Sequence, residues 1–399
     1  MKNPSIWIFN HYAQSDNLPG GTRHYDLAQE LVKKGFEVTI FASGFHHALL
    51  RDVVKYNKKK YFIEDISGVK FIWVKTHSYQ KNGLNRMINI VSYALRLNYI
   101  IPNLNLLKPD IIIGSTVHPF AGIIAKKFSK KYEAKFIFEI RDLWPQTFID
   151  MGLWKKNGFS SRVFRYIEKI TVRGSKKMIV LSPLTIKYLK ETYGYNQKNI
   201  LLLPNGVKKN FLNKTPKYEG NNKIDITYLG GIDKVHGLEY LISLANEIKD
   251  NNITFNIYGE GKEKKNLQTL CEAKNLKNII WHGSVPKTEV PKVLSESTVL
   301  FVSTSNVLYG SENKLYDYMA SAKPIILAIR GNHNNPIQKI GCGLTLDRDD
   351  VKESALKLTC YLKDEFEYFE EIGKKGQEYV IKNRTTEILA NNLITFIDV

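Results

Sequence analysis

Short runs of β-branched and aromatic residues alternate with amphipathic stretches along most of the chain, and this alternation restricts the fold more than any other feature. It is typical of a parallel sheet whose crossover helices cover both faces. In the first half we expect strands at residues 5–9, 37–42, 69–74, 110–114, 135–139 and 177–182. Helices are expected between them, at residues 21–34, 84–101, 118–130, 159–173 and 183–193.

The second half repeats this plan. We expect strands at residues 223–229, 253–258, 278–282, 298–303 and 323–328. Helices are expected at residues 237–250, 262–274, 286–296 and 312–321, with a helical tail at about 365–396. A polar, turn-rich segment that begins at Pro204-Asn205-Gly206 separates the two halves.

The chain has 399 residues, more than the roughly 100–200 residues of one ordinary domain. We therefore predict an α/β chain with two doubly wound, Rossmann-like domains that face a crevice. The first domain is expected at residues 1–204 and the second at 205–380, and a C-terminal helix at 381–399 is expected to pack back on the first. Ligands of such folds lie beyond the carboxyl ends of the strands.

Composition limits the partners. The formal charge of +19 indicates an anionic partner, and nucleic acid, anionic lipid head groups and sugar diphosphates all meet this description. The three cysteines show no metal-ligand spacing and are expected to be reduced thiols. The sequence has neither a recognisable signal peptide nor a run of about 20 apolar residues, so we expect a cytoplasmic protein without a spanning helix.

Two polar loops follow predicted strands of the first domain. Gly20 and Gly21 precede the helix expected at 21–34, where glycines would let backbone N–H groups approach an anion. A tight turn without a ligand is the alternative. His118 follows the strand at 110–114 and would face the crevice, although a purely structural histidine fits the pattern equally well.

A charged cluster follows the next strand, in the run Glu139-Ile140-Arg141-Asp142-Leu143-Trp144-Pro145. Charges that emerge from an apolar strand must pair or bind something. A structural ion pair of Arg141 with Asp142 or Glu139 is one alternative. The position at the presumed crevice favours a catalytic role for Glu139, Arg141 and Asp142.

The second domain carries a corresponding loop and a polar helix start. Gly230 and Gly231, with Lys234 nearby, could cradle a phosphate. Lys314 lies near the start of the helix at 312–321, where its charge and the helix dipole act on one anion. Asp317 shares that helix face, and its carboxylate could accept both hydroxyls of a ribose; a solvated face with a salt bridge is the alternative.

Taken in order, these segments resemble the retaining, nucleotide-sugar glycosyltransferases of the GT-B fold over nearly the whole chain. The resemblance rests on Pro19-Gly20-Gly21-Thr22-Arg23-His24-Tyr25 with Gly35-Phe36-Glu37-Val38-Thr39, on Leu181-Ser182 with Pro204-Asn205-Gly206-Val207, and on Lys314-Leu315-Tyr316-Asp317-Tyr318-Met319-Ala320 with Lys323-Pro324-Ile325-Ile326. The run from Glu139 to Pro145 is similar to a branch of fucosamine (N-acetylfucosamine) transferases of O-antigen and capsule assembly.

The resemblance implies a nucleotide-sugar donor, with UDP expected, and a lipid-linked or glycan acceptor in surface polysaccharide assembly. It implies that Asp317 contacts the donor ribose and that His118 lies near the transferred sugar. The donor diphosphate is expected at the Gly230 loop and at Lys314 with its neighbours Asn313 and Leu315. No cofactor is implied.

Three positions depart from the family pattern. Tyr309 stands where the family has a further glutamate, and Gly231 and His236 replace an arginine and a lysine of the phosphate loop. These departures shift the expected diphosphate contacts onto Lys314, Lys234 and Arg141. We see no Asp-x-Asp pair suited to a metal, and cationic side chains with helix N-termini can stabilise a leaving diphosphate instead.

Other functions remain open at this stage. A different GT-B enzyme, such as a nucleotide-sugar epimerase, would share the fold. A basic nucleic-acid-binding protein fits the charge, but no nucleic-acid-binding motif is evident, so no nucleic acid is expected as a partner. The residue at Tyr309 keeps a catalytically inactive binding protein among the alternatives.

Two helices lead us to expect that the protein attaches peripherally to the cytoplasmic face of an anionic membrane. The stretch 84–101 is strongly apolar, with Arg86 and Arg96 as its only charges. The helix at 159–173 is rich in arginine and lysine, which are attracted to anionic lipid. A core-packed helix and a solvated basic face are the respective alternatives.

Overall fold

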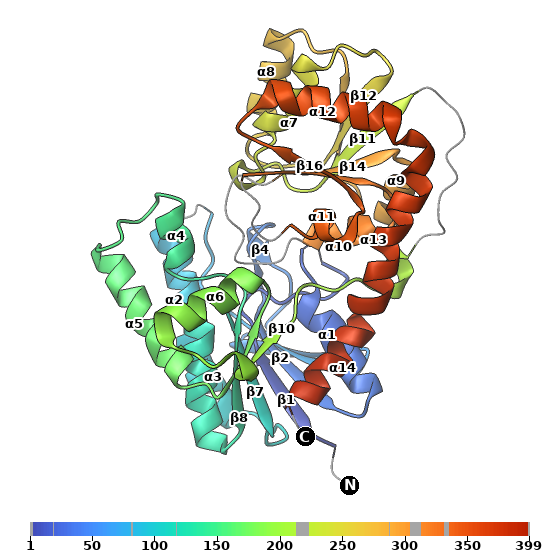
Figure 1. Cartoon of the computed structure of the whole chain (residues 1–399). Coiled ribbons are helices and arrows are strands. Elements are labelled where there is room, and N and C mark those ends of the chain that lie inside the picture. The colour runs from blue at the N-terminus through green and yellow to red at the C-terminus, as the bar shows by residue number, and fades with distance from the viewer. Residues whose placement is uncertain are drawn as a thin grey trace. The chain divides into compact units, whose positions relative to one another are not determined.

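The computed structural model describes residues 3–18, 20–80, 83–116, 118–212, 223–286, 288–303, 313–330 and 335–397. The chain divides into two compact units, each drawn in Figure 1. The first unit contains Met1–Pro204 and Thr386–Val399, and the second contains Asn205–Leu308 and Glu312–Thr385.

The first unit is built on an eight-stranded sheet in the order β10-β9-β8-β7-β1-β2-β6-β5. Its strands are β1 (Ser5–Phe9), β2 (Glu37–Ser43), β5 (Tyr61–Ile66), β6 (Val69–Val74), β7 (Ile111–Thr116), β8 (Lys135–Ile140), β9 (Lys177–Val180) and β10 (Ile200–Leu202). Neighbouring strands run parallel, except that β5 pairs antiparallel with β6. A separate hairpin joins β3 (Phe45–His46) and β4 (Arg51–Asp52).

Helices cover both faces of this sheet. They are α1 (Arg23–Lys33), α2 (Leu84–Ile100), α3 (Pro119–Tyr132), α4 (Gln146–Asp150), α5 (Phe159–Arg173), α6 (Pro183–Tyr193) and α14 (Thr386–Ile397). Because successive side chains of a strand point to opposite faces, Ile6 and Ile8 join the core under α1 and α14, whereas Trp7 and Phe9 join the core under α2 and α3.

The second unit has a six-stranded parallel sheet in the order β13-β12-β11-β14-β15-β16. Its strands are β11 (Ile224–Leu229), β12 (Ile253–Tyr258), β13 (Ile279–Gly283), β14 (Val299–Ser303), β15 (Ile325–Ile329) and β16 (Gly343–Asp347). Its helices are α7 (Glu239–Glu247), α8 (Lys264–Ala273), α9 (Val290–Glu296), α10 (Asn313–Ala320), α11 (Pro336–Ile340), α12 (Val351–Asp364) and α13 (Phe369–Asn383). One core lies under α7, α8 and α12, and the other lies under α9, α10 and α11.

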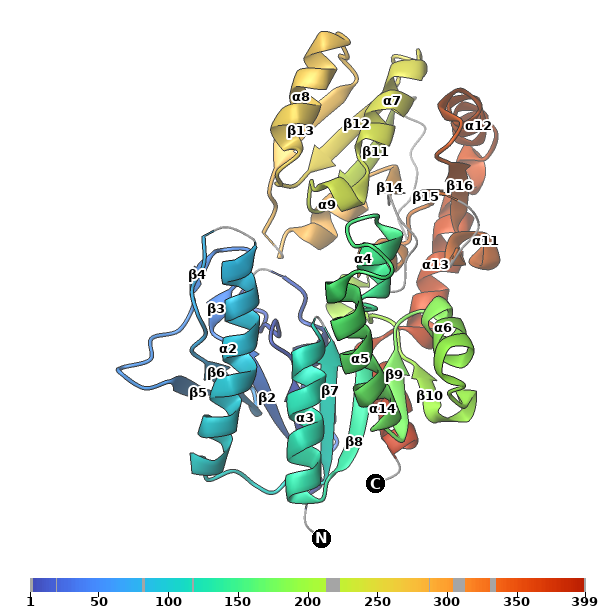
Figure 2. The ribbon, with the colours of Figure 1, turned by 90° about the vertical axis from the view of Figure 1, so that its left-hand side faces the viewer.

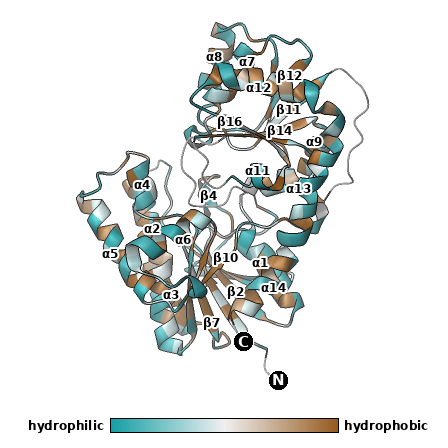
Figure 3. Cartoon of the chain, viewed as in Figure 1, coloured by the Kyte–Doolittle hydropathy of each residue, from teal (hydrophilic) through white to brown (hydrophobic). Residues whose placement is uncertain are grey.

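The predicted fold class is confirmed: two Rossmann-like α/β units with parallel sheets are present. Each expected strand is found with its ends shifted by a few residues, and the central strands are largely hydrophobic in Figure 3. The strands β5, β10 and β16 were not predicted. They lie at sheet edges and are at most half-buried along most of their length, so they lack the continuous apolar run of a central parallel strand. Among the described helices, none combines the length and the apolar character needed to cross a bilayer.

The last helix of the chain belongs to the first unit. The helix α14 packs against α1, and Leu389, Ala390, Leu393 and Ile397 enter the core that they share with the sheet. The preceding helix α13 packs against α10 within the second unit. The chain therefore changes unit between α13 and α14.

We expect Leu393→Ala to lower the free energy of unfolding of the first unit by about 2–5 kcal/mol, because it deletes a fully buried side chain. The exposed substitution Thr395→Ala, on the same helix, should change it by less than about 0.5 kcal/mol. Urea unfolding followed by tryptophan fluorescence reports mainly on this unit, which holds four of the five tryptophans. Equal stability of the two variants would show that α14 does not stabilise this core.

Candidate functional site

A buried charge network joins the start of α1 to the end of β8. Arg23 donates to Oε1 of Glu139 from Nε (3.0 Å) and from Nη2 (2.9 Å). His24 Nε2 lies 2.6 Å from Oε2 of the same carboxylate. Arg23 also donates to the carbonyl oxygens of Leu203 and Pro204, both at 2.7 Å. The network thus connects three segments that are far apart in the sequence.

Two neighbours establish the protonation of His24. The backbone N–H of Tyr12 donates to Oδ1 of Asn10 (3.1 Å), so the amide nitrogen of Asn10 faces Nδ1 of His24 at 2.8 Å. An amide nitrogen only donates, so Nδ1 accepts, and Nε2 carries the hydrogen that His24 donates to Glu139. In agreement with this neutral form, burial lowers the pKa of His24.

Glu139 is ionised in this network. Burial works against its ionisation, but the interactions with His24, Arg23 and Arg141 outweigh it and hold the pKa of Glu139 well below its usual range. Because His24 is neutral, its part is the hydrogen bond, and Arg23 supplies the nearest full charge. Glu139 is 1% exposed and joins α1 to β8, which gives it a positioning role, and a catalytic role stays a prediction.

Arg141 and Asp142 lie just beyond this carboxylate. Thr116, at the end of β7, accepts from the backbone N–H of Arg141 (3.0 Å) and donates to the carbonyl oxygen of Glu139 (3.3 Å). Arg141 is half-buried, and its Nε has no hydrogen-bond partner among the described residues, whereas Asp142 is exposed. Both side chains therefore stand at the carboxyl edge of the sheet.

His118 is enclosed by aromatic rings at the same edge. It is 1% exposed and lies against His11, Tyr12 and Tyr93. Neither of its ring nitrogens has a hydrogen-bond partner in the described part of the chain. Burial and the charge of Arg86 lower the pKa of His118 to about 3, so the ring is neutral at neutral pH. A role of His118 near a transferred sugar stays a prediction.

The glycine loop of the first unit is anchored from behind by this network. Gly20 and Gly21 are exposed just before α1, and Gly20 has a φ of +119°, which favours glycine. The hydroxyl of Thr22 donates to Asp26 (2.7 Å), one turn into the helix. Because Arg23 comes directly after Thr22, its bonds to Glu139 hold the loop at the carboxyl edge of the sheet.

In the second unit, Lys314 lies against the end of β11. Its Nζ donates to the hydroxyl of Tyr228 (2.9 Å) and stands 4.8 Å from the centre of that ring. The Tyr228 hydroxyl donates in turn to the carbonyl oxygen of Gly231 (2.6 Å). One turn later, the hydroxyl of Tyr318 bonds both the N–H and the carbonyl oxygen of Leu229. These bonds tie the start of α10 to the predicted phosphate loop.

His236 completes this cluster. Burial and the charge of Lys314 lower the pKa of His236 to about 4, so the imidazole is neutral at neutral pH. Its Nδ1 is buried and unpartnered among the described residues, and a Cβ on Gly231 would lie 3.1 Å from the ring. The residue that replaces a family lysine thus adds no charge, and Lys314 supplies the cation beside the loop.

Glycines let two loops of this unit meet backbone to backbone. The N–H of Gly230 donates to the carbonyl oxygen of Tyr258 (2.9 Å), and the N–H of Ile232 donates to that of Glu260 (3.0 Å). A Cβ at Gly259 would lie 1.8 Å from the carbonyl oxygen of Gly230, so no other residue fits there. The loop after β12 therefore supports the loop after β11 from beneath.

The remaining predicted donor contacts differ in exposure. The side chain of Leu315 is buried in the core beneath α10, and a donor contact at this position stays a prediction. Asp317 is half-buried three residues after Lys314, and Lys234 is exposed in the short helix Lys234–His236. Asn313 begins α10, but its side chain and the whole of Tyr309 lie outside the described residues.

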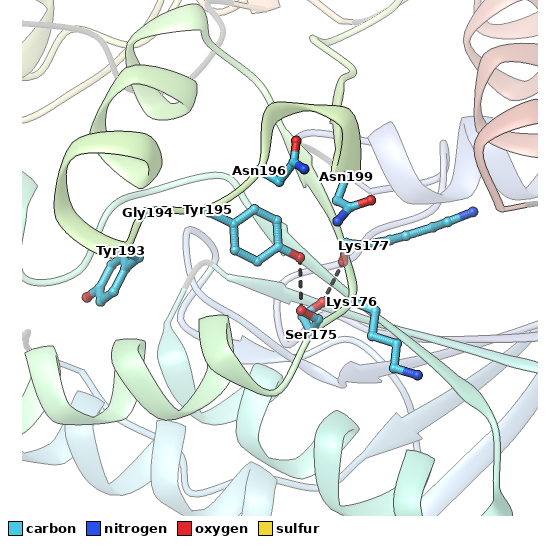
Figure 4. Close-up of a pocket in the computed structure, with 8 residues that line it drawn as sticks. All are labelled: Ser175, Lys176, Lys177, Tyr193, Gly194, Tyr195, Asn196 and Asn199. Carbon is cyan, nitrogen blue, oxygen red and sulfur yellow. Dashed lines mark hydrogen bonds between the residues drawn. The ribbon is translucent and has the colours of Figure 1, made fainter.

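A hollow of about 450 Å³ opens elsewhere in the first unit (Figure 4). It lies where β9 begins and α6 ends, and the hydroxyl of Tyr195 donates to the carbonyl oxygen of Ser175 beside it (2.9 Å). Parallel strands begin at this edge, opposite to the carboxyl edge that carries Glu139, so the hollow contains none of the predicted site residues. Among the described residues, no group of three or more His, Cys, Asp and Glu side chains is placed to hold a metal ion.

Sequence reasoning missed the partner of Glu139 and the role of Tyr228. Arg23 and Glu139 are 116 residues apart, and no local pattern connects them. The one available signal was that both stand at carboxyl ends of the first sheet. Tyr228 belongs to an apolar strand run, which predicts a core residue and not a hydroxyl that holds Lys314.

We expect Glu139→Gln to destabilise the first unit by about 3–5 kcal/mol at pH 7, because the buried Arg23 guanidinium loses its counter-charge. The folded-state pKa of Glu139 is lowered, so the stabilisation is present above the unfolded pKa of about 4.3 and is lost as the pH falls toward the folded value. Urea unfolding between pH 3 and 7 measures this, and the exposed Glu191→Gln serves as the control. A stable variant with the wild-type pH profile would contradict the expectation.

Two protein families match this chain. Residues 20–211 match Glycosyltransferase Family 4, and residues 208–379 match Glycosyl transferases group 1. The chain is 26% identical over 247 residues to the poly(ribitol-phosphate) alpha-N-acetylglucosaminyltransferase of Staphylococcus aureus (strain COL). The matched region covers 61% of this chain and 46% of that protein. The chain spans between 46% and 65% of the lengths of the curated relatives that it matches.

Solved structures share the whole architecture. The sucrose-phosphate synthase from Thermosynechococcus elongatus superposes with a TM-score of 0.78 at 15% identity, covering 99% of this chain and 98% of that one. The TM-score is 0.67, at 12% identity, for HepE of Anabaena in complex with UDP-glucose. It is 0.69, at 11% identity, for WaaG, a glycosyltransferase involved in lipopolysaccharide biosynthesis. Each of these two covers 99% of this chain and 100% of its own. At such identities the likeness shows the fold alone. With the two family matches, this chain belongs to the GT-B glycosyltransferases, with a Glycosyltransferase Family 4 region followed by a Glycosyl transferases group 1 region.

Proposed function

We propose that this chain transfers a sugar from a UDP-linked donor to a lipid-linked or glycan acceptor during assembly of a bacterial surface polysaccharide, such as an O-antigen. Membership of the two families supports glycosyl transfer. The UDP-glucose bound to HepE supports a UDP-linked donor. WaaG and the staphylococcal relative act in lipopolysaccharide biosynthesis and on poly(ribitol-phosphate), respectively, which supports an acceptor at the cell surface.

The contact of Lys314 with the loop after β11 carries the donor assignment. Its ammonium group is held by Tyr228 next to the backbone of Gly230 and Gly231, so a cation stands beside the loop that we assign to the diphosphate. Negative charge grows on the diphosphate as the sugar leaves, and such pre-oriented groups stabilise it most in the transition state. Asp317 follows on the same helix, at the position that we assign to the ribose hydroxyls.

The first unit would supply the acceptor side and the environment of the transferred sugar. His118 is neutral and buried, and we assign its nitrogen without a hydrogen to accept from a hydroxyl of that sugar, which leaves its N–H for another group. Arg141 and Asp142 stand at the same carboxyl edge and remain the charged groups that could act on the reacting atoms. Retention of configuration, and an N-acetylated or deoxy hexose as the transferred sugar, rest on the family resemblance.

We expect Lys314→Met to reduce kcat/KM at least about tenfold, because about 1.4 kcal/mol or more of transition-state stabilisation would be lost. The loss should fall mainly on kcat, since the charge on the diphosphate grows as the bond breaks. The matched control is Lys265→Met, an exposed lysine of α8. Steady-state kinetics measures both variants.

A thermal-shift panel of nucleotide sugars tests the function itself, because a bound donor raises the apparent stability of the folded state. We expect a UDP-sugar to shift the melting temperature of the wild type. Turnover of the donor without any acceptor would indicate an epimerase instead. A Lys314→Met variant with wild-type kcat/KM would move the diphosphate contact to Lys234 or Arg141.

We further propose that the first unit docks on the anionic cytoplasmic face of the membrane through α2, α3 and α5. Figure 2 shows these helices side by side, and α3 packs against both others. Their only acidic residue is Glu168, which is buried and accepts hydrogen bonds from two tyrosines. The basic residues on the three helices are Arg86, Arg96, Lys126, Lys127, Lys130, Lys131, Arg162, Arg165, Lys169 and Arg173.

Exposed apolar side chains accompany these cations. Leu84 of α2 is 85% exposed, and Phe159 of α5 is 84% exposed. The helix α2 buries Tyr93 and Leu97 in the core, whereas Leu95 and Tyr99 are exposed and could contact a membrane surface. Apolar side chains beside lysine and arginine are typical of helices that bind the surface of an anionic bilayer.

We expect the wild type to sediment with vesicles of anionic lipid at low salt and not with vesicles of zwitterionic lipid. The variant Phe159→Ser with Tyr166→Ser should bind at least about tenfold more weakly, since two exposed aromatic side chains would no longer insert. Leu356→Ser, at an exposed leucine of the second unit, is the control. Equal sedimentation of all three proteins would exclude α5 as the docking surface.

A further inference from the structure

Arg86 is a half-buried cation that has no acidic partner among the residues that the structure describes. It lies in the first turn of α2, where its Nε donates to the hydroxyl of Tyr12 (3.4 Å) and its guanidinium stands 5.9 Å from the centre of that ring. The groups that act on its charge are the hydroxyls of Tyr12 and Tyr79, and no carboxylate among the described residues is one of them. A buried charge usually has a counter-charge, so this position calls for an anion.

The side chains around Arg86 are neutral. Burial, with the neighbouring His118 and Arg86, lowers the pKa of His11 well below its usual value, and burial with Arg86 does the same for His118. Tyr12 and Tyr79 are buried as well. None of these groups contributes negative charge, so the cluster of His11, Tyr12, Tyr79, Arg86 and His118, here called the Arg86 cluster, is electropositive.

Two of its imidazoles keep unsatisfied nitrogens. Asn89 donates from its amide nitrogen to Thr76 (2.8 Å) and to the carbonyl oxygen of His77 (2.6 Å), so its amide oxygen faces Nε2 of His11 at 2.8 Å. His11 therefore carries its hydrogen on Nε2, and its buried Nδ1 is left without a donor. Both nitrogens of the buried His118 lack partners within the described residues. The neutral ring of His118 carries one N–H, and a buried N–H without an acceptor points to a ligand with acceptor oxygens. The lone pair on Nδ1 of His11 calls instead for a hydroxyl donor.

We infer that the Arg86 cluster binds a phosphate or diphosphate group of the acceptor. This inference rests on the proposed function, which assigns the donor diphosphate to Lys314 in the other unit. A guanidinium presents paired N–H groups that match phosphate oxygens, and a neutral histidine adds an N–H donor without a second charge. The cluster belongs wholly to the first unit and follows the carboxyl end of β1. Arg86 is thus a specificity-determining residue for a phosphate-bearing acceptor.

The first test measures binding without turnover. Inorganic pyrophosphate is titrated calorimetrically into the protein, once alone and once with saturating UDP, which blocks the donor site. With UDP present, we expect Arg86→Met to weaken pyrophosphate binding at least about tenfold, a loss of about 1.4 kcal/mol. The matched control is Arg96→Met on the same helix, also half-buried, whose Nη1 donates to the carbonyl oxygen of Lys75.

The outcomes separate the inference from the proposed function. If the wild type binds no pyrophosphate beside UDP, or if Arg86→Met binds it as the wild type does, the inference is wrong. If UDP does not bind at all, the proposed function fails, and the titration of pyrophosphate alone still decides whether Arg86 holds an anion. Circular dichroism of each variant shows that any loss does not come from unfolding.

The second test separates the two sources of phosphate by kinetics. We expect Arg86→Met to raise KM at least about tenfold for an acceptor that carries a diphosphate, with KM for the UDP-sugar within about twofold of the wild type. The same glycan without phosphate should be used equally well by both proteins. Arg86→Lys should restore part of the affinity, since it keeps the charge but not the paired donors. A rise in KM for the donor instead would assign Arg86 to the donor site and overturn the inference.

Discussion

The ion pair of Glu139 with Arg23 is the interaction on which the ligand-binding edge of the first unit depends. It draws the start of α1 onto the end of β8, and the same guanidinium holds the carbonyl oxygens of Leu203 and Pro204. The loop with Gly20 is held in place because Arg23 follows it directly. A carboxylate buried this deeply stays ionised only with a full counter-charge and complete hydrogen bonding, and the network supplies both.

A second constraint is the protonation of the buried histidines. Burial lowers the pKa values of His24, His118 and His236, and a nearby cation lowers the last two further. These imidazoles therefore provide hydrogen bonds without adding positive charge. The charge at the two candidate sites rests on Arg86 and Lys314, so an anionic ligand can be balanced by few, well-placed cations within a chain of formal charge +19.

Much of the fold was predictable from local patterns. Runs such as Ile111–Ile113 and Ile325–Leu327 are typical of strands buried on both faces, and each was expected as a strand. The edge strands β5 and β16 were not predicted, because half-exposed strands mix polar and apolar residues and show no clear pattern. In α10, helical spacing correctly placed Lys314 and Asp317 on one side, but it could not tell that Leu315 faces the core.

The sequence by itself determined the two doubly wound units, the glycine loops and the placement of His118, Arg141 and Lys314 at carboxyl ends of strands or starts of helices. These features follow from periods of two and about 3.6 residues, which a chain displays locally. Only the tertiary structure decided that Glu139 pairs with Arg23 and that no carboxylate from the described part of the chain pairs with Arg86. These contacts join segments that are far apart in the chain. The segments come close to each other only after the sheets have assembled and the helices have packed.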